Sequence, residues 1–462
     1  MTLKSKTRRD FLKASLLSGG GLCALGAMNP FVRLARAEES ETTESADESG
    51  MIKDRYYIFC YFGGGWDILL SLDPRDPATF TAEEMASTRI QTGYELLDLG
   101  MENPVLQTPT GLYGYYLGDL ATQHRDKISI VRGINMETLS HEGGRLRFMT
   151  GRMPEGAVPT RDSTDVVMAA LLGEANLVPN IALSADSFNN GHPSYATALT
   201  AESTAAVVEA MSRKNTLDPA LEGQIDLLLN QHNGCPHALA SSFLARAHGS
   251  RVTTQQMLSS NLGDTFDFTL ETNAVKAVRS HYGFSKTDLA GVPALTALAE
   301  QALVQKVSRC ISIRVPGHFD THTTLEQGAD QMAAFNAIAR LIDNLEQTPY
   351  PDNSGDSWLD RTTVMCFSEF SRTPIVNSEV GRDHWLTNAC LLAGGGIKGG
   401  QVVGASSDIG MTPRPLNLTT GLVDEGSKPV TPDHIVRGLY TMLGYTEDVA
   451  DLRVEPLTAM LK

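Results

Sequence analysis

Short apolar runs alternate with longer amphipathic patterns along most of the chain. Short apolar runs that are followed by glycine or polar residues are typical of buried strands. Residues 162–172 and 325–345 instead carry apolar positions three and four apart, which predicts helices. The predicted strands are residues 54–62, 128–131, 310–315, 362–367 and 386–393.

Strands that alternate with helices indicate an α/β fold. We predict a mostly parallel central sheet with helices on both of its faces. Residues 201–306 differ from the rest, because they carry several amphipathic helical segments and little strand signal. We therefore expect one α/β domain over residues 51–462, with a helical insertion at about 201–306.

A glycine-rich segment follows the last predicted strand. Gly394-Gly395-Gly396-Ile397-Lys398-Gly399 fits the dinucleotide-binding pattern G-x-G-x-x-G, but strand-like residues 401–403 follow it where that motif requires a helix. The segment is better interpreted as a glycine hairpin.

The N-terminus has the features of a twin-arginine export signal. Arg8 and Arg9 precede Phe11 and Leu12, and an apolar stretch and an Ala-Arg-Ala cleavage pattern at 35–37 follow. We predict a signal peptide over 1–37, an acidic disordered spacer over 38–50 and a periplasmic or otherwise exported product. An uncleaved anchor is the alternative, although the apolar stretch is short and glycine-rich for a membrane span.

Composition narrows the classes of function. The net charge of −16 disfavours nucleic acid and anionic lipid as partners. The six cysteines include no C-x-x-C pair, so the sequence offers no iron–sulfur or c-type haem motif. The partners we expect are the twin-arginine translocase and a small anionic substrate.

Polar residues follow the predicted strands 54–62, 128–131, 310–315 and 362–367, and a further polar segment contains Asp383 and His384. Ligands of α/β proteins bind beyond the carboxyl ends of the strands, so these positions predict a functional site. Carboxylate and imidazole groups together suit zinc, manganese or iron. One such pair is more often an ordinary polar loop, but the pattern recurs at strand after strand. The predicted metal ligands are Asp67, Asp320, His322, Glu369, Asp383 and His384.

Candidate catalytic residues lie beside these ligands. Ser140 and His141 precede an apparent helix, whose N-terminus favours anions and can assist a nucleophile. Alternatively, Ser140 only caps that helix. Arg145 and Arg372 are candidates for holding the oxygens of an anion, although arginines at such positions more often form surface ion pairs.

The order of these motifs resembles domain-of-unknown-function family 1501, an exported bacterial family. The resemblance covers essentially all of the mature chain and is carried by Ser140-His141, Asp320-Thr321-His322, the segment Ser368-Glu369-Phe370-Ser371-Arg372-Thr373-Pro374 and Asp383-His384. That family is placed in the alkaline phosphatase-like superfamily, beside sulfatases and cofactor-independent phosphoglycerate mutases. The resemblance implies an alkaline phosphatase-like α/β fold with one or two divalent ions, such as zinc, manganese or calcium. It also implies that Ser140 is similar to the serine of the mutase nucleophile loop.

Two departures from the superfamily are visible. Asp320 and His322 are two residues apart, where the superfamily spaces the pair by four, and Glu369-Phe370 stands where Asp-His is usual. The formylglycine signature of sulfatases is absent, which disfavours that chemistry.

We therefore expect an exported metal-dependent hydrolase of a phosphate or related anionic ester. The first alternative is a non-catalytic metal-binding protein that acts as a binding or assembly factor in the envelope. A redox enzyme is the second, but the sequence shows no flavin, haem or molybdenum site to support it.

Overall fold

The computed structural model describes residues 54–97, 99, 104–156, 159–212, 219–232, 262–445 and 447–462. The predicted signal peptide, the acidic spacer and part of the predicted helical insertion lie outside the described residues. Within the described ranges, no helix combines the length and apolarity needed to cross a membrane.

An eight-stranded sheet forms the centre of the molecule, in the order β12-β4-β11-β8-β1-β7-β5-β6. Only β11 pairs antiparallel with its neighbours, so the sheet is mostly parallel, as predicted. Small two-stranded sheets join β2 to β3 and β9 to β10. The strands are β1 (Tyr56–Tyr61), β2 (Val105–Thr108), β3 (Gly111–Gly114), β4 (Ile128–Asn135), β5 (Asn180–Leu183), β6 (Leu199–Ala201), β7 (Cys310–Arg314), β8 (Thr362–Phe367), β9 (Ser371–Arg372), β10 (His384–Trp385), β11 (Thr387–Gly394) and β12 (Gln401–Val403).

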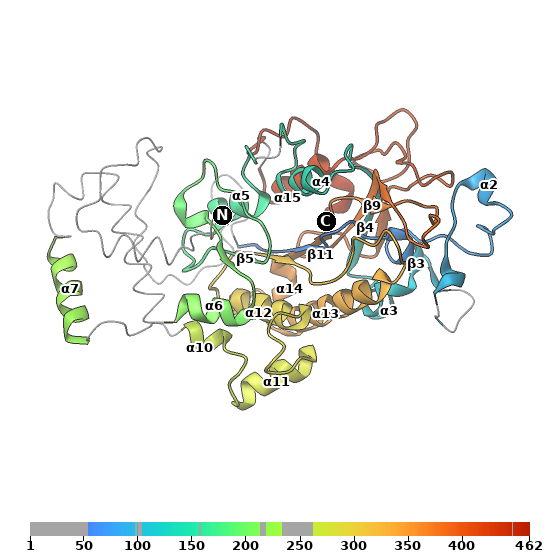
Figure 1. The fold of residues 1–462 in the computed structure, drawn as a ribbon. Coiled ribbons are helices and arrows are strands. Elements are labelled where there is room, and N and C mark those ends of the chain that lie inside the picture. The colour runs from blue at the N-terminus through green and yellow to red at the C-terminus, as the bar shows by residue number, and fades with distance from the viewer. Residues whose placement is uncertain are drawn as a thin grey trace.

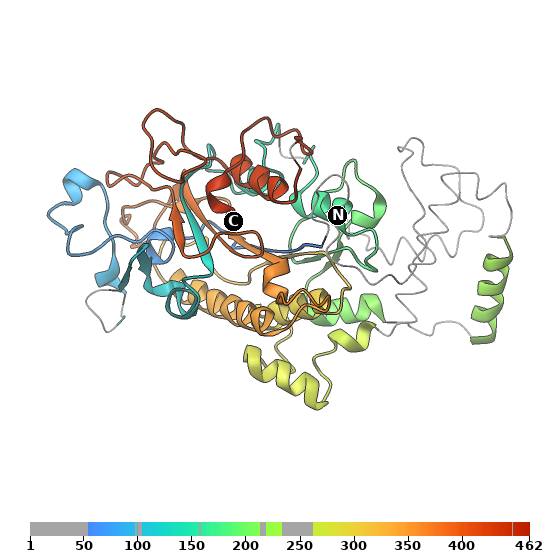
Figure 2. The same ribbon diagram turned by 180° about the vertical axis from the view of Figure 1, so that it is seen from behind.

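Helices cover both faces of this sheet, as Figures 1 and 2 show from opposite sides. The α-helices are α2 (Met85–Thr88), α3 (Asp119–Gln123), α4 (His141–Thr150), α5 (Thr164–Leu172), α6 (Thr204–Met211), α7 (Pro219–His232), α10 (Leu262–Phe266), α11 (Asn273–Tyr282), α12 (Val292–Val304), α13 (Gln327–Gln347), α14 (Trp358–Arg361) and α15 (Pro432–Met442). Short 3-10 helices span Ile68–Leu70, Tyr94–Leu96, Tyr115–Leu117, Ser194–Ala196 and Thr458–Met460.

Strand β1 shows why both faces need a helical cover. All six of its residues are buried, and successive side chains point to opposite faces. Tyr56, Ile58 and Cys60 belong to a core shared with α12 and α13. Tyr57, Phe59 and Tyr61 belong to a second core, shared with α4, α5 and α15. The continuous apolar run in the sequence is thus the mark of a strand buried on both sides.

The region predicted as a helical insertion contributes α6, α7, α10, α11 and α12 to the described residues. Helix α12 is largely buried and packs in the core under the sheet. In the view of Figure 1, α10 and α11 lie below α12 and α13.

The glycine-rich segment 394–404 does not form the hairpin that the sequence predicts. Strand β12 pairs in parallel with β4, and β4 lies between β12 and β11 in the sheet. The chain therefore crosses over β4 after β11. Gly394, Gly396 and Gly400 adopt left-handed backbone conformations along this crossover, which begins with a tight turn closed by the Ile397 amide and the Gly394 oxygen.

Candidate metal centre

The loops that carry the predicted ligands meet at one edge of the sheet. The carboxyl ends of β1, β4, β7 and β8 lie at this edge, because these strands run in the same direction. Strand β11 runs the other way, so its beginning lies there too, and His384 reaches the edge from just before it.

Gly64 lets the loops after β1 and β7 approach closely. Its φ of +133° is a conformation that side-chain-bearing residues rarely adopt, and a Cβ atom there would lie 2.6 Å from the backbone nitrogen of Asp320. The Gly64 amide also donates a 2.7 Å hydrogen bond to Oε1 of Glu369. One glycine thus packs against the loops after β7 and β8.

Asp320 is the carboxylate on which the other groups converge. Its side chain is 52% exposed, and its Oδ1 accepts a 2.6 Å hydrogen bond from the buried guanidinium of Arg372. Partial burial by itself raises the pKa of Asp320, but Arg372 and then His141 and His322 outweigh that effect and hold the pKa below its usual value. Asp320 is therefore a carboxylate at neutral pH.

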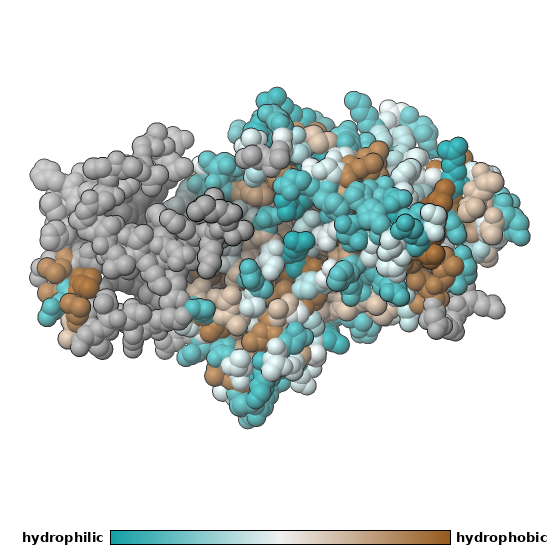
Figure 3. Space-filling model, in the orientation of Figure 1, coloured by the Kyte–Doolittle hydropathy of each residue, from teal (hydrophilic) through white to brown (hydrophobic). Residues whose placement is uncertain are grey.

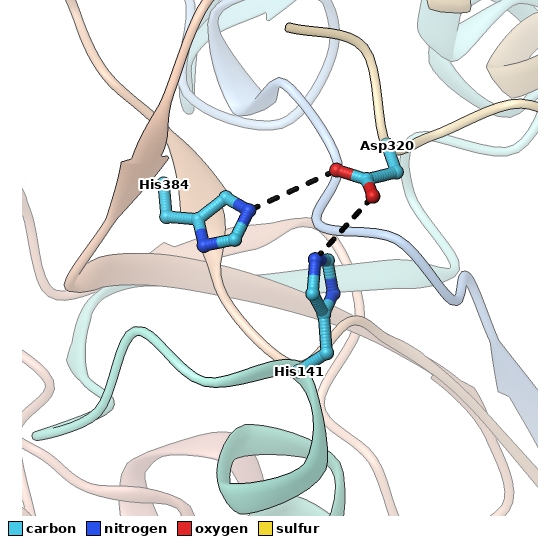
Figure 4. A group of neighbouring side chains, drawn as sticks. All are labelled: His141, Asp320 and His384. Atoms are coloured by element: carbon cyan, nitrogen blue, oxygen red, sulfur yellow. Dashed lines mark ion pairs between the residues drawn. The ribbon is translucent and has the colours of Figure 1, made fainter.

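Two imidazoles approach this carboxylate from different sides (Figure 4). Nε2 of His141, at the start of α4, lies 3.5 Å from Oδ2 of Asp320. Nε2 of His384, from β10, lies 3.7 Å from Oδ1. Ligand atoms of these three residues lie within 4.8 Å of one another, as a shared metal ion requires.

The outer nitrogens of both rings are held by acceptors. Nδ1 of His141 lies 2.8 Å from Oε1 of Glu369, and Nδ1 of His384 lies 2.8 Å from the backbone oxygen of Leu139. A carbonyl oxygen can only accept, so Nδ1 of His384 carries the proton. Burial alone raises the pKa of Glu369, but hydrogen bonds from His141, Ser368 and Gly64 hold it below its usual value. Glu369 is thus ionised and accepts a hydrogen bond from His141.

His322 completes the cluster. Its Nδ1 lies 2.8 Å from Oδ1 of Asp383, while its Nε2 lies 3.1 Å from Oδ1 of Asp320 and 3.2 Å from Nε2 of His384. The hydrogen bond from His322 lowers the pKa of Asp383, so Asp383 is also an acceptor.

These contacts fit a bound cation. With each Nδ1 atom held by an outward partner, the Nε2 atoms of His141, His322 and His384 are the ring atoms that face the ionised carboxylate of Asp320. A metal ion bound among these atoms would be held by imidazole nitrogens and a carboxylate oxygen, which are usual ligands of zinc and similar ions. Histidine ligands fixed by a carboxylate or carbonyl on their other nitrogen are the usual arrangement around metals in proteins. His141, His322, His384 and Asp320 would hold the ion, and Glu369, Asp383 and Leu139 would orient the histidines.

Comparison with known proteins assigns the chain to a family. The family model described as "Protein of unknown function (DUF1501)" matches residues 55–437. The chain belongs to the DUF1501 family. No curated protein matches the sequence. Among solved structures, this DUF1501 chain is similar to Ps i-CgsB, solved in complex with k-i-k-neocarrahexaose, at 11% identity and a TM-score of 0.38. That likeness covers 87% of this chain and 75% of the other.

Asp67 does not join the ligands of this DUF1501 protein. It is buried, and its Oδ2 lies 2.9 Å from Nε of the buried Arg382. Its Oδ1 accepts a 3.0 Å hydrogen bond from the Leu69 amide, which caps a short 3-10 helix. Burial raises the pKa of Asp67 despite the neighbouring Arg382. Asp67 thus stabilises the loop after β1 through its contacts with Arg382 and the Leu69 amide.

Ser140 lies beside the cluster and caps α4. Its Oγ accepts a 3.3 Å hydrogen bond from the Gly143 amide, which is the capping role that the sequence offered as an alternative. The adjacent His141, predicted as a catalytic residue, lies instead among the metal-ligand candidates.

Both predicted anion-binding arginines already have partners. Arg145 pairs with Glu142 and Asp186, each at 2.7 Å. Arg372 is fully buried, and besides Asp320 it donates to the backbone oxygens of Gly64, Gly65, Phe319 and Arg382. These contacts give Arg372 a positioning role for Asp320 and the surrounding loops, which is not the role predicted.

Two further groups at this edge escaped the sequence-based prediction. The backbone oxygen of Leu139 orients His384, and no side-chain pattern could have revealed it. Arg314, the last residue of β7, is exposed at the same edge. Its signal was only its place at the end of a predicted strand.

Proposed function

We propose that this chain is an exported, metal-dependent hydrolase of a phosphate or related anionic ester. The observation that carries the proposal is the convergence of the Nε2 atoms of His141, His322 and His384 on the Asp320 carboxylate, with each Nδ1 atom held by an acceptor. The resemblance of the motif order to the alkaline phosphatase-like superfamily supports the reaction class. The Arg8-Arg9 motif supports export through the twin-arginine route.

The residues of the chain would divide the work as follows. His141, His322, His384 and Asp320 bind the ion, and the buried Glu369 keeps the His141 ring in one orientation. A divalent cation bound there supplies a Lewis acid that activates a water or hydroxyl group and offsets charge on the ester. Arg372 holds Asp320 in place through its 2.6 Å hydrogen bond. The exposure of Asp320 and His322 leaves the centre open to a substrate from solvent.

Metal analysis of protein purified from the cytoplasm tests the proposal. We expect wild-type protein and the surface variant Asp126→Ala to contain bound zinc, manganese or calcium, and the double variant Asp320→Ala/His322→Ala to lack it. The metal-loaded wild type should hydrolyse p-nitrophenyl phosphate or p-nitrophenyl sulfate. Equally little metal in wild type and double variant would contradict the proposal.

A metal-loaded protein without hydrolytic activity would favour the non-catalytic binding or assembly factor. The engagement of Ser140 as a helix cap is the observation that keeps this alternative in view. Export is tested separately, by comparing the periplasmic fraction of the wild type with that of the Arg8→Lys/Arg9→Lys variant.

A further inference from the structure

Arg314 occupies a position where α/β proteins bind their ligands. It is the last residue of β7 and therefore lies at the carboxyl edge of the sheet, six residues before Asp320 in the sequence. In β7, Ser312 faces the α4 and α5 side of the sheet, because it lines a recess there with Phe148 and Thr164. By strand alternation, Arg314 faces the same side as Ser312 and as Tyr61, its partner in β1.

Unlike its neighbours, Arg314 pairs with no carboxylate among the residues that the structure describes. Arg145, Arg372 and Arg382 at this edge pair with Asp186, Asp320 and Asp67, respectively. Across the described ranges, no acidic side chain lies within 4.0 Å of the Arg314 guanidinium, although the chain carries a net charge of −16. An exposed arginine left unpaired in an acidic protein is available to an external anion.

The glycine loop after β1 connects Arg314 to the metal centre. A Cβ atom on Gly63 would lie 3.1 Å from Nε of Arg314 and 2.9 Å from the Tyr61 ring. A Cβ atom on Gly64, the next residue, would touch the backbone of Asp320. The Arg314 side chain thus lies over one residue of this loop, and the carboxylate-bearing segment lies against the next. An anion held by the Arg314 guanidinium would therefore lie beside the same loop that packs against the Asp320 segment.

We propose that Arg314 binds an oxyanion group of the substrate and so determines that this site accepts phosphate, sulfate or carboxylate compounds rather than neutral esters. This inference rests on the proposed function. The planar guanidinium donates two parallel hydrogen bonds to such a group, which gives orientation as well as attraction. Figure 3 shows hydrophilic residues gathered over the part of the surface where β9 lies in Figure 1.

Isothermal titration of inorganic phosphate and inorganic sulfate into the full-length, metal-loaded protein tests the assignment. We expect Arg314→Gln to lower the affinity for the more tightly bound of the two anions at least tenfold. Arg314→Lys should lower that affinity less. Arg125→Gln, at an exposed arginine just before β4 and thus at the opposite edge of the sheet, should bind as the wild type does. Metal content and thermal unfolding should be the same in all four proteins.

The outcomes separate this inference from the proposed function. A wild type that contains no metal would contradict the proposed function. A metal-loaded wild type that binds neither anion, or binds them as tightly as Arg314→Gln does, would overturn the assignment of Arg314 and leave the metal centre in place.

Discussion

Nδ1 of His141 lies 2.8 Å from Oε1 of Glu369, and this contact ties the start of α4 to the loop after β8. Glu369 is almost fully buried and also accepts hydrogen bonds from Ser368 and from the Gly64 amide. The carboxylate therefore cannot move without disturbing the loop after β1. His141 is held rigidly by a residue that does not itself face the centre of the cluster.

Glu369→Gln removes the charge of this acceptor while preserving its shape. Neutral glutamine orients His141 less firmly and lowers the basicity of its Nε2, so we expect metal affinity to fall roughly 10- to 100-fold. Competition with a chromophoric chelator measures the change. Glu83→Gln, at an exposed glutamate, is the matched control and should leave affinity unchanged. Equal metal affinities in the two variants would show that Glu369 does not act on the metal centre.

The sequence predicted the long buried strands well, because burial on both faces produces an apolar run that needs no partner to be visible. Strands β5 and β6 were missed, since runs of four and three residues carry too little pattern. The position of β12 was wrong for a different reason. Its pairing with β4 joins segments that are far apart in the sequence, whereas the glycines before it are typical of a local turn.

For the site, strand ends pointed to Asp320, His322 and His141, because a parallel sheet gathers those ends at one edge. His384 joins them from just before the antiparallel β11. The same logic included Asp67, which the fold turns toward Arg382. Whether a carboxylate after a strand faces the site or the core depends on a partner distant in sequence. The pattern of residues along the chain does not contain that information.

Gly64→Ala tests the close approach of the loops after β1 and β7. The added Cβ would lie 2.6 Å from the Asp320 nitrogen, and the φ of +133° is strained for alanine. We expect the free energy of unfolding to fall by about 1–3 kcal/mol and bound metal to be lost, because Asp320 must shift. Urea denaturation and metal analysis measure the two effects. Gly156→Ala, where a Cβ meets nothing within 4 Å, is the control. Full metal occupancy in Gly64→Ala would contradict the prediction.

Arg372→Ala should destabilise the protein strongly. The variant removes the guanidinium that donates to the backbone oxygens of Gly65, Phe319 and Arg382 and to the carboxylate of Asp320. We expect a loss of about 3–5 kcal/mol in the free energy of unfolding. Arg372→Lys should recover only part of it, because an ammonium group cannot reach all of these acceptors. Arg453→Ala, at an exposed arginine, should have no measurable effect. If Arg372→Ala unfolded at the same urea concentration as Arg453→Ala, the positioning role would be excluded.

We expect Asp73 to make the stability of the protein sensitive to acid. Its side chain is buried between two arginines, and its Oδ1 lies 2.8 Å from Nη1 of Arg75 and 3.5 Å from Nε of Arg132. Burial raises the pKa of Asp73, but the two arginines and the Ser406 hydroxyl outweigh it and hold the pKa below its usual value. A lowered folded pKa means that the stabilisation is present above the unfolded pKa of about 3.9 and is lost as pH falls through the folded value. Asp73→Asn should therefore be about 3–5 kcal/mol less stable at pH 7. The urea midpoints of the wild type and of Asp73→Asn should converge below pH 4. A gap that stayed constant down to pH 2 would show that Asp73 does not titrate in this way.

Ser140 permits a test that separates helix capping from nucleophilic attack. Asparagine caps helices as well as serine does but has no hydroxyl group, whereas alanine has neither property. We expect Ser140→Ala to lose about 1 kcal/mol of unfolding free energy and Ser140→Asn to keep it. If water attacks the ester, metal-loaded Ser140→Asn should hydrolyse p-nitrophenyl phosphate at the wild-type rate. Because the Ser140 hydroxyl accepts from the Gly143 amide and has no histidine nitrogen among its hydrogen-bond partners in the described structure, we predict this result. A Ser140→Asn variant that binds metal and folds normally but has no activity would instead identify Ser140 as the nucleophile.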